Sequence, residues 1–248
     1  MSQLFTTIFY QPILNLLVFL YNTVSFQDLG VAIILLTVII KAILWPLNKK
    51  SIKSQKDLQE LQPKLNELKK QYGDDKMGLS QATMNLYKES KINPLSSCLP
   101  LLIQLPFLFA VYRVFRDGLN NKLDLVYSFI NKPEVINGVF LGFLDLNKPS
   151  IYLAVLAGLA QFWQAKMMST KKPEIKTDSS KDESMTSIMN KQMLYFMPAI
   201  TIFIGISLPG GLTLYWFIIT LLTALQQALI FKKKNPALGE TIEGDIIK

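Results

Sequence analysis

Five long apolar segments decide what this chain can fold into. A helix needs about 20 residues to cross a bilayer, and the 248-residue chain offers five apolar stretches near that length. They are residues 29–48, 93–117, 150–168, 192–208 and 212–231. Half of all residues are hydrophobic and 18% are charged, with the charges gathered into blocks between these segments. The sequence therefore predicts an all-α polytopic membrane protein with five transmembrane helices.

Composition also excludes several classes of site. Histidine is absent, so neither a histidine-ligated metal nor a nucleophile paired with a histidine base is available. Cys98 is the single cysteine, which rules out an intrachain disulfide. The net charge of +8 could indicate a nucleic-acid partner, but it is more typical of the lysine bias of cytoplasmic loops in membrane proteins. We expect neither a metal nor a cofactor.

The distribution of lysine and arginine predicts the orientation. Residues 49–91, 166–191 and 232–248 together contain 20 of these cations, whereas residues 113–149 contain five and residues 1–28 contain none. If successive segments alternate across the membrane, the 20 fall on one side. The positive-inside rule makes that side cytoplasmic, which places the N-terminus outside and the C-terminus inside.

The connecting segments follow from this orientation. We expect an extracytoplasmic loop over 118–149, a cytosolic loop over 169–191, an extracytoplasmic turn over 209–211 and a cytosolic tail over 232–248. The turn is predicted from the Pro-Gly-Gly sequence between two apolar runs.

Residues 1–28 are predicted to hold an extracytoplasmic amphipathic helix. Gln11, Pro12 and Asn15 interrupt its apolar run, and the basic start of a signal peptide is missing. A sixth span over residues 3–21 is the alternative.

Residues 49–92 are predicted to form a cytosolic helical hairpin. Leucines and a tyrosine recur at alternating spacings of three and four, which is typical of a helix that packs against another helix. They are Leu58, Leu61, Leu65, Leu68 and Tyr72. Pro63 should kink or restart the first arm, and a helical pattern resumes after the Gly73–Gly78 break. The alternative is a charged helical linker that only connects two spans.

Lys41 is the one cation deep inside a predicted span, and no aspartate or glutamate lies within residues 29–47, 94–112, 150–168 or 193–231 to pair with it. A lysine near the middle of a membrane costs at least about 2.5–3.5 kcal/mol on insertion scales. Two interpretations remain open. The side chain could extend along the helix to the cytosolic headgroups, or it could face a water-filled cavity open to the cytosol.

Other polar residues in the spans could line such a cavity. The second span contains Gln104 and three prolines, each of which leaves a backbone carbonyl in need of another partner. The third contains Gln161 and Gln164, and the fifth contains hydroxyl and aromatic groups. These are Thr213, Tyr215, Trp216, Thr220 and Thr223. Taken singly, each is better explained as a hydrogen bond between helices or as an interfacial aromatic residue.

Four stretches resemble the YidC/Oxa/Alb family of membrane protein insertases. They are LLTVIIKAILWPL, LQPKLNELKKQYGDDK, NPLSSCLPLLIQLPFLFAVYRVF and LPGGLTLYWFIITLLTALQQALIF. The resemblance covers about residues 1–234 in order. Within the family, the chain resembles a minimal bacterial form without a large outer domain. It implies a plasma-membrane protein whose five spans surround a hydrophilic groove that opens to the cytosol.

The resemblance also implies functional residues. Lys41 matches the cation of the groove, where the family usually has arginine, and Thr37 lies one turn earlier on the same face. Gln104, Gln161, Tyr215 and Trp216 fall in matching spans and are expected to form the groove wall. Loss of the guanidinium removes bidentate hydrogen bonding but keeps the positive charge.

The function implied by the resemblance is physical rather than catalytic. The groove captures nascent membrane proteins and releases their apolar segments into the bilayer without nucleotide hydrolysis, and the chain shows no phosphate-binding glycine loop. The expected partners are nascent substrates, the ribosome and lipid, with dependence on a Sec translocon left open. A monomer without nucleic-acid specificity is expected.

Two other classes were considered. A channel or transporter usually shows paired ionisable residues or inverted repeats, and neither is visible in the sequence. An intramembrane hydrolase would need a serine–lysine pair, but Ser96 and Ser97 lie at the cytosolic end of their span, at a poor depth for Lys41.

Overall fold

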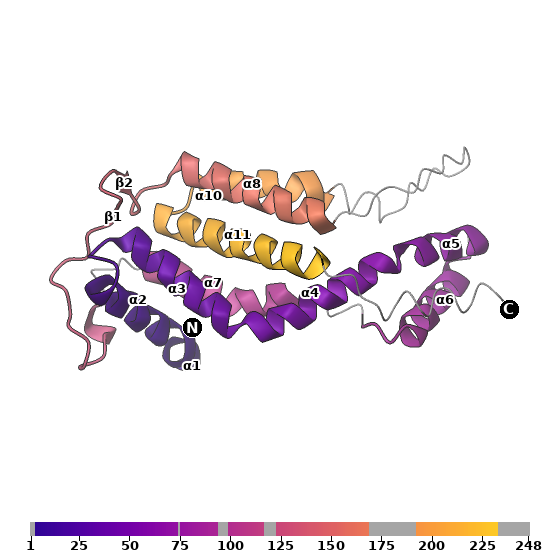
Figure 1. The fold of residues 1–248 in the computed structure, drawn as a ribbon, viewed down its shortest axis with the longest axis horizontal. Helices are drawn as coiled ribbons and strands as arrows, with labels where there is room; N and C mark the ends of the chain where they lie inside the picture. Colours follow the sequence, from indigo (N-terminus) through magenta and orange to yellow (C-terminus); the bar gives the residue numbers. More distant parts are fainter. Residues whose placement is uncertain (1–2, 74, 94–98, 117–122, 169–191, 233–248) are drawn as a thin grey trace.

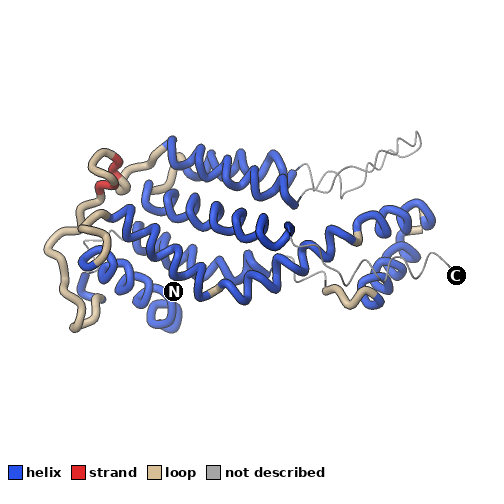
Figure 2. Tube along the Cα trace, viewed as in Figure 1, coloured by secondary structure: helices blue, strands red, loops and turns tan. Residues whose placement is uncertain are grey.

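The computed structural model describes residues 3–73, 75–93, 99–116, 123–168 and 192–232. Most of these residues are helical, and the longest helices lie side by side in a bundle (Figure 1). A helical hairpin extends from one end of the bundle, and a long loop with a small strand pair covers the other end (Figure 2). The two ends of the molecule therefore have different architectures.

The N-terminal helix packs lengthwise against the bundle. It comprises α1 (Gln3–Phe5), a π-helical stretch η1 (Thr6–Tyr10) and α2 (Gln11–Thr23). The polar residues that interrupt its apolar run have partners in the loop: Asn15 accepts a hydrogen bond from Tyr127 N at 2.7 Å, and the Gln11 and Asn15 amides both donate to Leu125 O. These two side chains fix the helix to the loop, which explains their place in an apolar segment.

The first predicted span is not one straight helix. The helix α3 (Leu29–Ile43) ends before Leu44, and α4 (Trp45–Glu60) continues at a bend of 69°. Pro46, in the first turn of α4, lacks the N–H that would bond back to Ala42 O, and its ring crowds that carbonyl. The helix predicted over 29–48 is therefore broken at Leu44, and the cause is the proline of the WP pair; that this segment spans the membrane stays a prediction.

Two shorter helices, α5 (Gln62–Tyr72) and α6 (Lys76–Glu89), lie side by side where the sequence predicts the hairpin (Figure 1). Pro63 lies in the first turn of α5, so the chain restarts at that point rather than kinking. Gly73 ends α5 with a positive φ of 48°, and Asp75 caps α6 by accepting the Gly78 N–H at 2.9 Å.

The remaining long helices complete the bundle. They are α7 (Leu99–Arg116), α8 (Ile151–Met168), α10 (Met197–Gly205), which follows the π-helical η5 (Gln192–Phe196), and α11 (Gly210–Lys232). The helix α11 packs against both α3 and α8, and α10 packs against α8. Among the prolines of the second predicted span, Pro106 lies inside α7 and Pro94 lies outside the described residues.

The predicted turn at 209–211 needs a correction. Gly210 and Gly211 form the first turn of α11, and the connection instead runs from Ile206 to Pro209. A Cβ on Gly211 would lie 2.2 Å from a ring carbon of Phe115, and one on Gly210 would lie 2.9 Å from Lys148 O. These glycines permit close approach between segments, whereas the sequence suggested that they supply turn flexibility.

The long loop between α7 and α8 adds structure that the all-α prediction lacks. It contains a 3-10 turn, η4 (Leu123–Leu125), and an antiparallel pair of two-residue strands, β1 (Val139–Phe140) and β2 (Leu144–Asp145). Its carbonyls at Leu146 and Lys148 accept the N–H groups of Gly211 and Gly210 at 2.9 Å each. The loop thus satisfies donors at the start of α11 that no helical carbonyl can reach.

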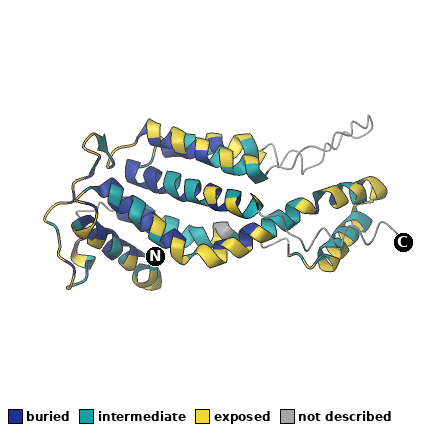
Figure 3. Ribbon diagram, in the orientation of Figure 1, coloured by how far each residue is buried: buried dark blue, intermediate teal, exposed yellow. Residues whose placement is uncertain are grey.

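Buried side chains concentrate in the bundle, whereas the hairpin is largely exposed (Figure 3). One apolar core joins the N-terminal helix, α3, α7, α11 and the loop. Within the described residues, two helices could cross a bilayer by length and composition, Gln3–Thr23 and Gly210–Lys232, and the bent α3–α4 pair is a third candidate. The five-span arrangement and the interfacial position of the N-terminal helix stay predictions.

Candidate functional site

Lys41 lies in the last turn of α3, directly before the bend, with only 5% of its surface exposed. Its ammonium donates a hydrogen bond to Thr223 Oγ1 of α11 at 2.8 Å, and that hydroxyl donates in turn to Ile219 O at 2.6 Å. No carboxylate lies within ion-pair distance of Lys41 in the described part of the chain. The cation is therefore buried with a neutral partner.

Thr37 and Tyr215 are fully buried near the same two helices. The Thr37 hydroxyl donates to Ile33 O of its own helix at 2.6 Å, which satisfies it without a partner on α11. The Tyr215 hydroxyl accepts a hydrogen bond of 2.5 Å from Gln104 Nε2 and so joins α11 to α7. Eight residues of helix separate Tyr215 from Thr223, which is about 12 Å along α11.

The other two predicted wall residues lie differently. Gln161 accepts a hydrogen bond from Thr201 Oγ1, so its partner comes from α10 rather than from α3 or α11. Trp216 is half-buried on α11. The structure brings Lys41 to Thr223 of α11 and Gln104 to Tyr215, buries Thr37 with a bond inside α3, and uses Gln161 to join α8 to α10.

The sequence patterns did not single out two further polar residues on α11, the almost completely buried Gln226 and Gln227. Gln226 Nε2 donates to Trp45 O across the bend, and Gln227 Nε2 points at Met168 Sδ of α8, both at 3.4 Å. Among the described residues, neither side-chain oxygen has a hydrogen-bond partner. The signal was present, because Thr223, Gln226 and Gln227 recur at helical spacing on an otherwise apolar helix.

We call Lys41, Thr223, Gln226 and Gln227 the polar seam. These side chains line the contact between α11 and the α3–α4 bend, with Gln227 reaching α8. Lys41, Gln226 and Gln227 are buried, and Thr223 is half-buried. A buried amide oxygen without a donor is costly, so the seam offers acceptors as well as a cation. Its chemistry suits recognition of charged and polar groups.

No group of three acidic, histidine or cysteine side chains in the described residues could hold a metal ion. The polar seam itself is rich in donors and neutral acceptors and contains no acid.

Comparison with known proteins gives one consistent result. A family described as "60Kd inner membrane protein" matches residues 19–237. A protein of Fusobacterium nucleatum subsp. nucleatum, named "Membrane protein insertase YidC", is 37% identical over 226 residues, which cover 90% of this chain and 97% of that relative.

Two longer relatives carry the same name. The protein of Pelobacter propionicus is 36% identical over 232 residues, 92% of this chain and 39% of the relative. That of Haemophilus influenzae strain Rd is 35% identical over 225 residues, 90% of this chain and 36% of the relative. The chain thus spans about two fifths of these relatives and nearly all of the one from F. nucleatum.

Proposed function

This multi-pass cell membrane protein belongs to the 60Kd inner membrane protein family, the family of the YidC membrane protein insertases, and we propose that it inserts nascent membrane proteins into the lipid bilayer. The observation that carries the proposal is the contact between Lys41 and Thr223, because it keeps a cation inside an apolar bundle without an acidic partner. A cation held in this way can exchange its neutral hydroxyl partner for a charged one at small cost.

The polar seam is the proposed capture site. When a substrate arrives, the contact between α11 and the α3–α4 bend opens toward the hairpin, and water enters along Thr223, Gln226 and Gln227. Lys41 then attracts acidic or polar residues of the substrate's translocated tail, and the glutamine oxygens accept its N–H groups. Bringing water and charge partway into the membrane shortens the dry path across about 30 Å of hydrocarbon.

The rest of the predicted groove supports the opened state. Tyr215 and Gln104 lie deeper along α11, beyond the seam, where their hydrogen bond would mark the closed end of the groove. Thr37, Gln161 and Trp216 complete its wall. The substrate's apolar segment leaves along the lipid-exposed side of the bundle, and its transfer into lipid supplies the driving force without nucleotide hydrolysis or covalent catalysis.

The orientation is part of the proposal. Five spans with the N-terminus outside put the lysine-rich hairpin, α5 and α6, in the cytosol and the strand-bearing loop outside. The hairpin receives the nascent chain or the ribosome, and the N-terminal helix lies at the outer interface. We propose that a monomer suffices, with or without a Sec translocon.

Reconstitution tests this function directly. Liposomes that contain only the purified protein should insert a short single-span substrate, measured by protease protection of the translocated tail, in the absence of nucleotide. Empty liposomes provide the background. Equal protection with and without the protein would refute the proposed function, and solute leakage of the same liposomes would instead point to a channel.

A further inference from the structure

The end of the bundle opposite the hairpin carries strongly exposed apolar side chains that the proposed insertion mechanism does not use. Phe26, in the connection between α2 and α3, is 98% exposed. Leu141 and Phe143, on either side of Gly142 in the turn between β1 and β2, are 60% and 78% exposed. Full exposure of two phenylalanines in water is unfavourable and calls for an apolar partner.

The backbone presents these side chains at a conformational cost. Phe26 and Gln27 have φ angles of 53° and 61°, and Leu141 has a φ of 53°, in the left-handed region that residues with a Cβ rarely adopt. A flexible tip could relax out of this region and cover its apolar groups. The strain persists because neighbouring contacts hold both segments.

Asp28 connects the two segments. One oxygen of its carboxylate accepts the Val31 N–H at 3.0 Å and caps α3, while the other accepts the Leu141 N–H at 2.7 Å. Phe140 packs against the first turn of α3, where a Cβ on Gly30 would lie 2.0 Å from a carbon of its ring. The turn between β1 and β2 is thus fixed to the start of α3, the same helix end that lies beside Phe26.

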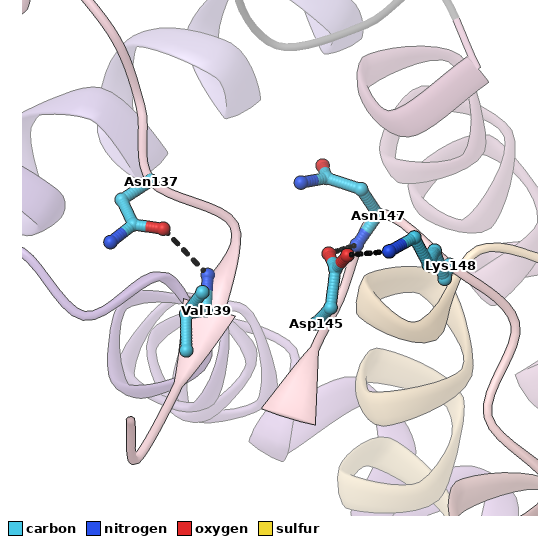
Figure 4. A network of polar contacts seen from close by, with 5 residues as sticks. All are labelled: Asn137, Val139, Asp145, Asn147 and Lys148. Carbon is cyan, nitrogen blue, oxygen red and sulfur yellow. Dashed lines mark hydrogen bonds and ion pairs between the residues drawn. The ribbon is translucent and has the colours of Figure 1, made fainter. Parts of the chain in front are cut away.

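Polar contacts gather at the base of the strand pair (Figure 4). Asn137 accepts the Val139 N–H at 3.1 Å, Asp145 accepts the Asn147 N–H at 3.0 Å, and Lys148 forms an ion pair of 3.1 Å with Asp145. The neighbouring carbonyls of Leu146 and Lys148 bond to the start of α11. The base is therefore tied to two helices, and only the uncharged tip of Leu141, Gly142 and Phe143 projects.

We propose that Phe26, Leu141 and Phe143 form a rigid anchor that inserts into the lipid leaflet at this end of the bundle, held in position by Asp28. Lipid fits better than a protein because the tip carries no charge and the helices that begin or end beside it also expose apolar side chains (Figure 1). Val24 at the end of α2, and Ile151 and Tyr152 at the start of α8, are exposed as well. Aromatic side chains near helix ends commonly anchor a membrane protein at the interface between lipid and water.

Spin labelling tests the anchor independently of insertion activity. In the full chain carrying Cys98→Ser, reconstituted in phosphatidylethanolamine–phosphatidylglycerol liposomes, a nitroxide is attached to Phe26→Cys or Phe143→Cys. Its collision rates with dissolved oxygen, which concentrates in lipid, and with a water-soluble nickel chelate are compared. Phe203→Cys, at an exposed position on the apolar α10, is the lipid reference. Lys148→Cys, at an exposed position just after β2, is the water reference.

We expect the oxygen-to-nickel ratio at positions 26 and 143 to approach that at 203 and to exceed that at 148 several-fold. Ratios equal to that at 148 would overturn the anchor, because the tip would then lie in water. Low collision rates with both reagents would also overturn it, because a protein surface would then cover the tip.

A second variant tests the role of Asp28. Asp28→Ser keeps a favoured helix-capping residue but cannot bond Val31 and Leu141 together. The ratio should fall at position 143 and stay unchanged at position 26. An unchanged ratio at both positions would refute the tether.

Discussion

The helix α3 and the hairpin of α5 and α6 differ in how their helices are stabilised. Eight of the 15 residues of α3 are buried, and they contact the N-terminal helix, α11 and the loop. The helix α6 has no buried residue, and α5 has only Leu65. The helix α3 therefore shares the stability of the whole bundle. The hairpin of α5 and α6 relies on local contacts and can unfold without the bundle.

This difference matches the proposed division of labour. A segment that meets varied nascent chains benefits from independent motion, and exposed Met77 and Met84 give the hairpin adaptable apolar surface. A segment that holds a buried cation needs a rigid surround, because an ammonium that could move to lipid headgroups would leave the polar seam. The helix α4 joins the two regions, because its first turns still pack against the bundle and its end leads into α5.

The largest expected effect separates the two regions by stability. Leu36→Ala removes a buried side chain of α3 and should destabilise the bundle by about 2–5 kcal/mol. Leu65→Ala should raise hydrogen exchange in α5 and α6 while leaving the thermal transition of the bundle unchanged. Hydrogen exchange and thermal unfolding in detergent measure both. Loss of bundle stability in Leu65→Ala would mean that the hairpin is part of one cooperative unit.

The next effect concerns the cation. Lys41→Ala should lower insertion of substrates with acidic translocated tails by about tenfold or more, as expected for a lost charged hydrogen bond of about 1.5–3 kcal/mol. Substrates with neutral tails should be affected much less, and Lys41→Arg should retain activity. Protease protection in proteoliposomes gives the ratio. Full activity of Lys41→Ala on several acidic tails would remove the cation from substrate capture.

A smaller effect tests the partner that positions the ammonium. Thr223→Val keeps the shape of the side chain and removes the hydroxyl that accepts from Lys41. We expect a smaller loss on acidic tails than for Lys41→Ala, because the ammonium keeps its charge and loses only the hydroxyl that positions it. Thr223→Ser should restore it, and Lys41→Ala should abolish the difference between valine and threonine. If Thr223→Val caused the same loss in the Lys41→Ala background as in the unchanged chain, Thr223 would be a purely structural residue.

The smallest effect concerns the C-terminal tail, which lies outside the described residues. Residues 235–248 contain Glu240, Glu243 and Asp245 against Lys248 alone, so RNA phosphates would repel them. Deleting residues 236–248 should leave ribosome co-sedimentation and insertion nearly unchanged, whereas replacing the hairpin lysines with glutamine should weaken sedimentation at low salt. A large loss on tail deletion would point to a specific contact that charge does not explain.

Local patterns predicted most helices but not their contacts. Apolar runs gave the positions of α3, α8 and α11, and proline and glycine gave the hairpin breaks. The break at Leu44 was missed because a tryptophan–proline pair inside an apolar run can either kink or end a helix. Gly210 and Gly211 were read as turn residues because the Phe115 ring and the Lys148 carbonyl that require them lie far away in sequence.

The candidate site shows the same limit. Lys41 stood out by itself, since charge inside an apolar run is visible in one segment. Its partner Thr223 lies 182 residues away and could be found only from the packing of α3 against α11. Gln161 was assigned to the groove by resemblance, and the structure gives it a partner on α10. Pairing between helices is not encoded in the periodicity of either helix.

Cysteine accessibility at position 41 tests the central claim, that the packed polar seam opens to water on the hairpin side. In a Cys98→Ser background, Lys41→Cys is treated with a membrane-impermeant maleimide added from that side. Val38→Cys, on the exposed apolar face of α3, is the lipid control, and Gln81→Cys on α6 is the water control. We predict labelling at 41 that is slower than at 81, far faster than at 38, and accelerated during insertion of a substrate with a neutral tail, which does not need the cation. Protection at 41 equal to that at 38, with and without substrate, would contradict the account.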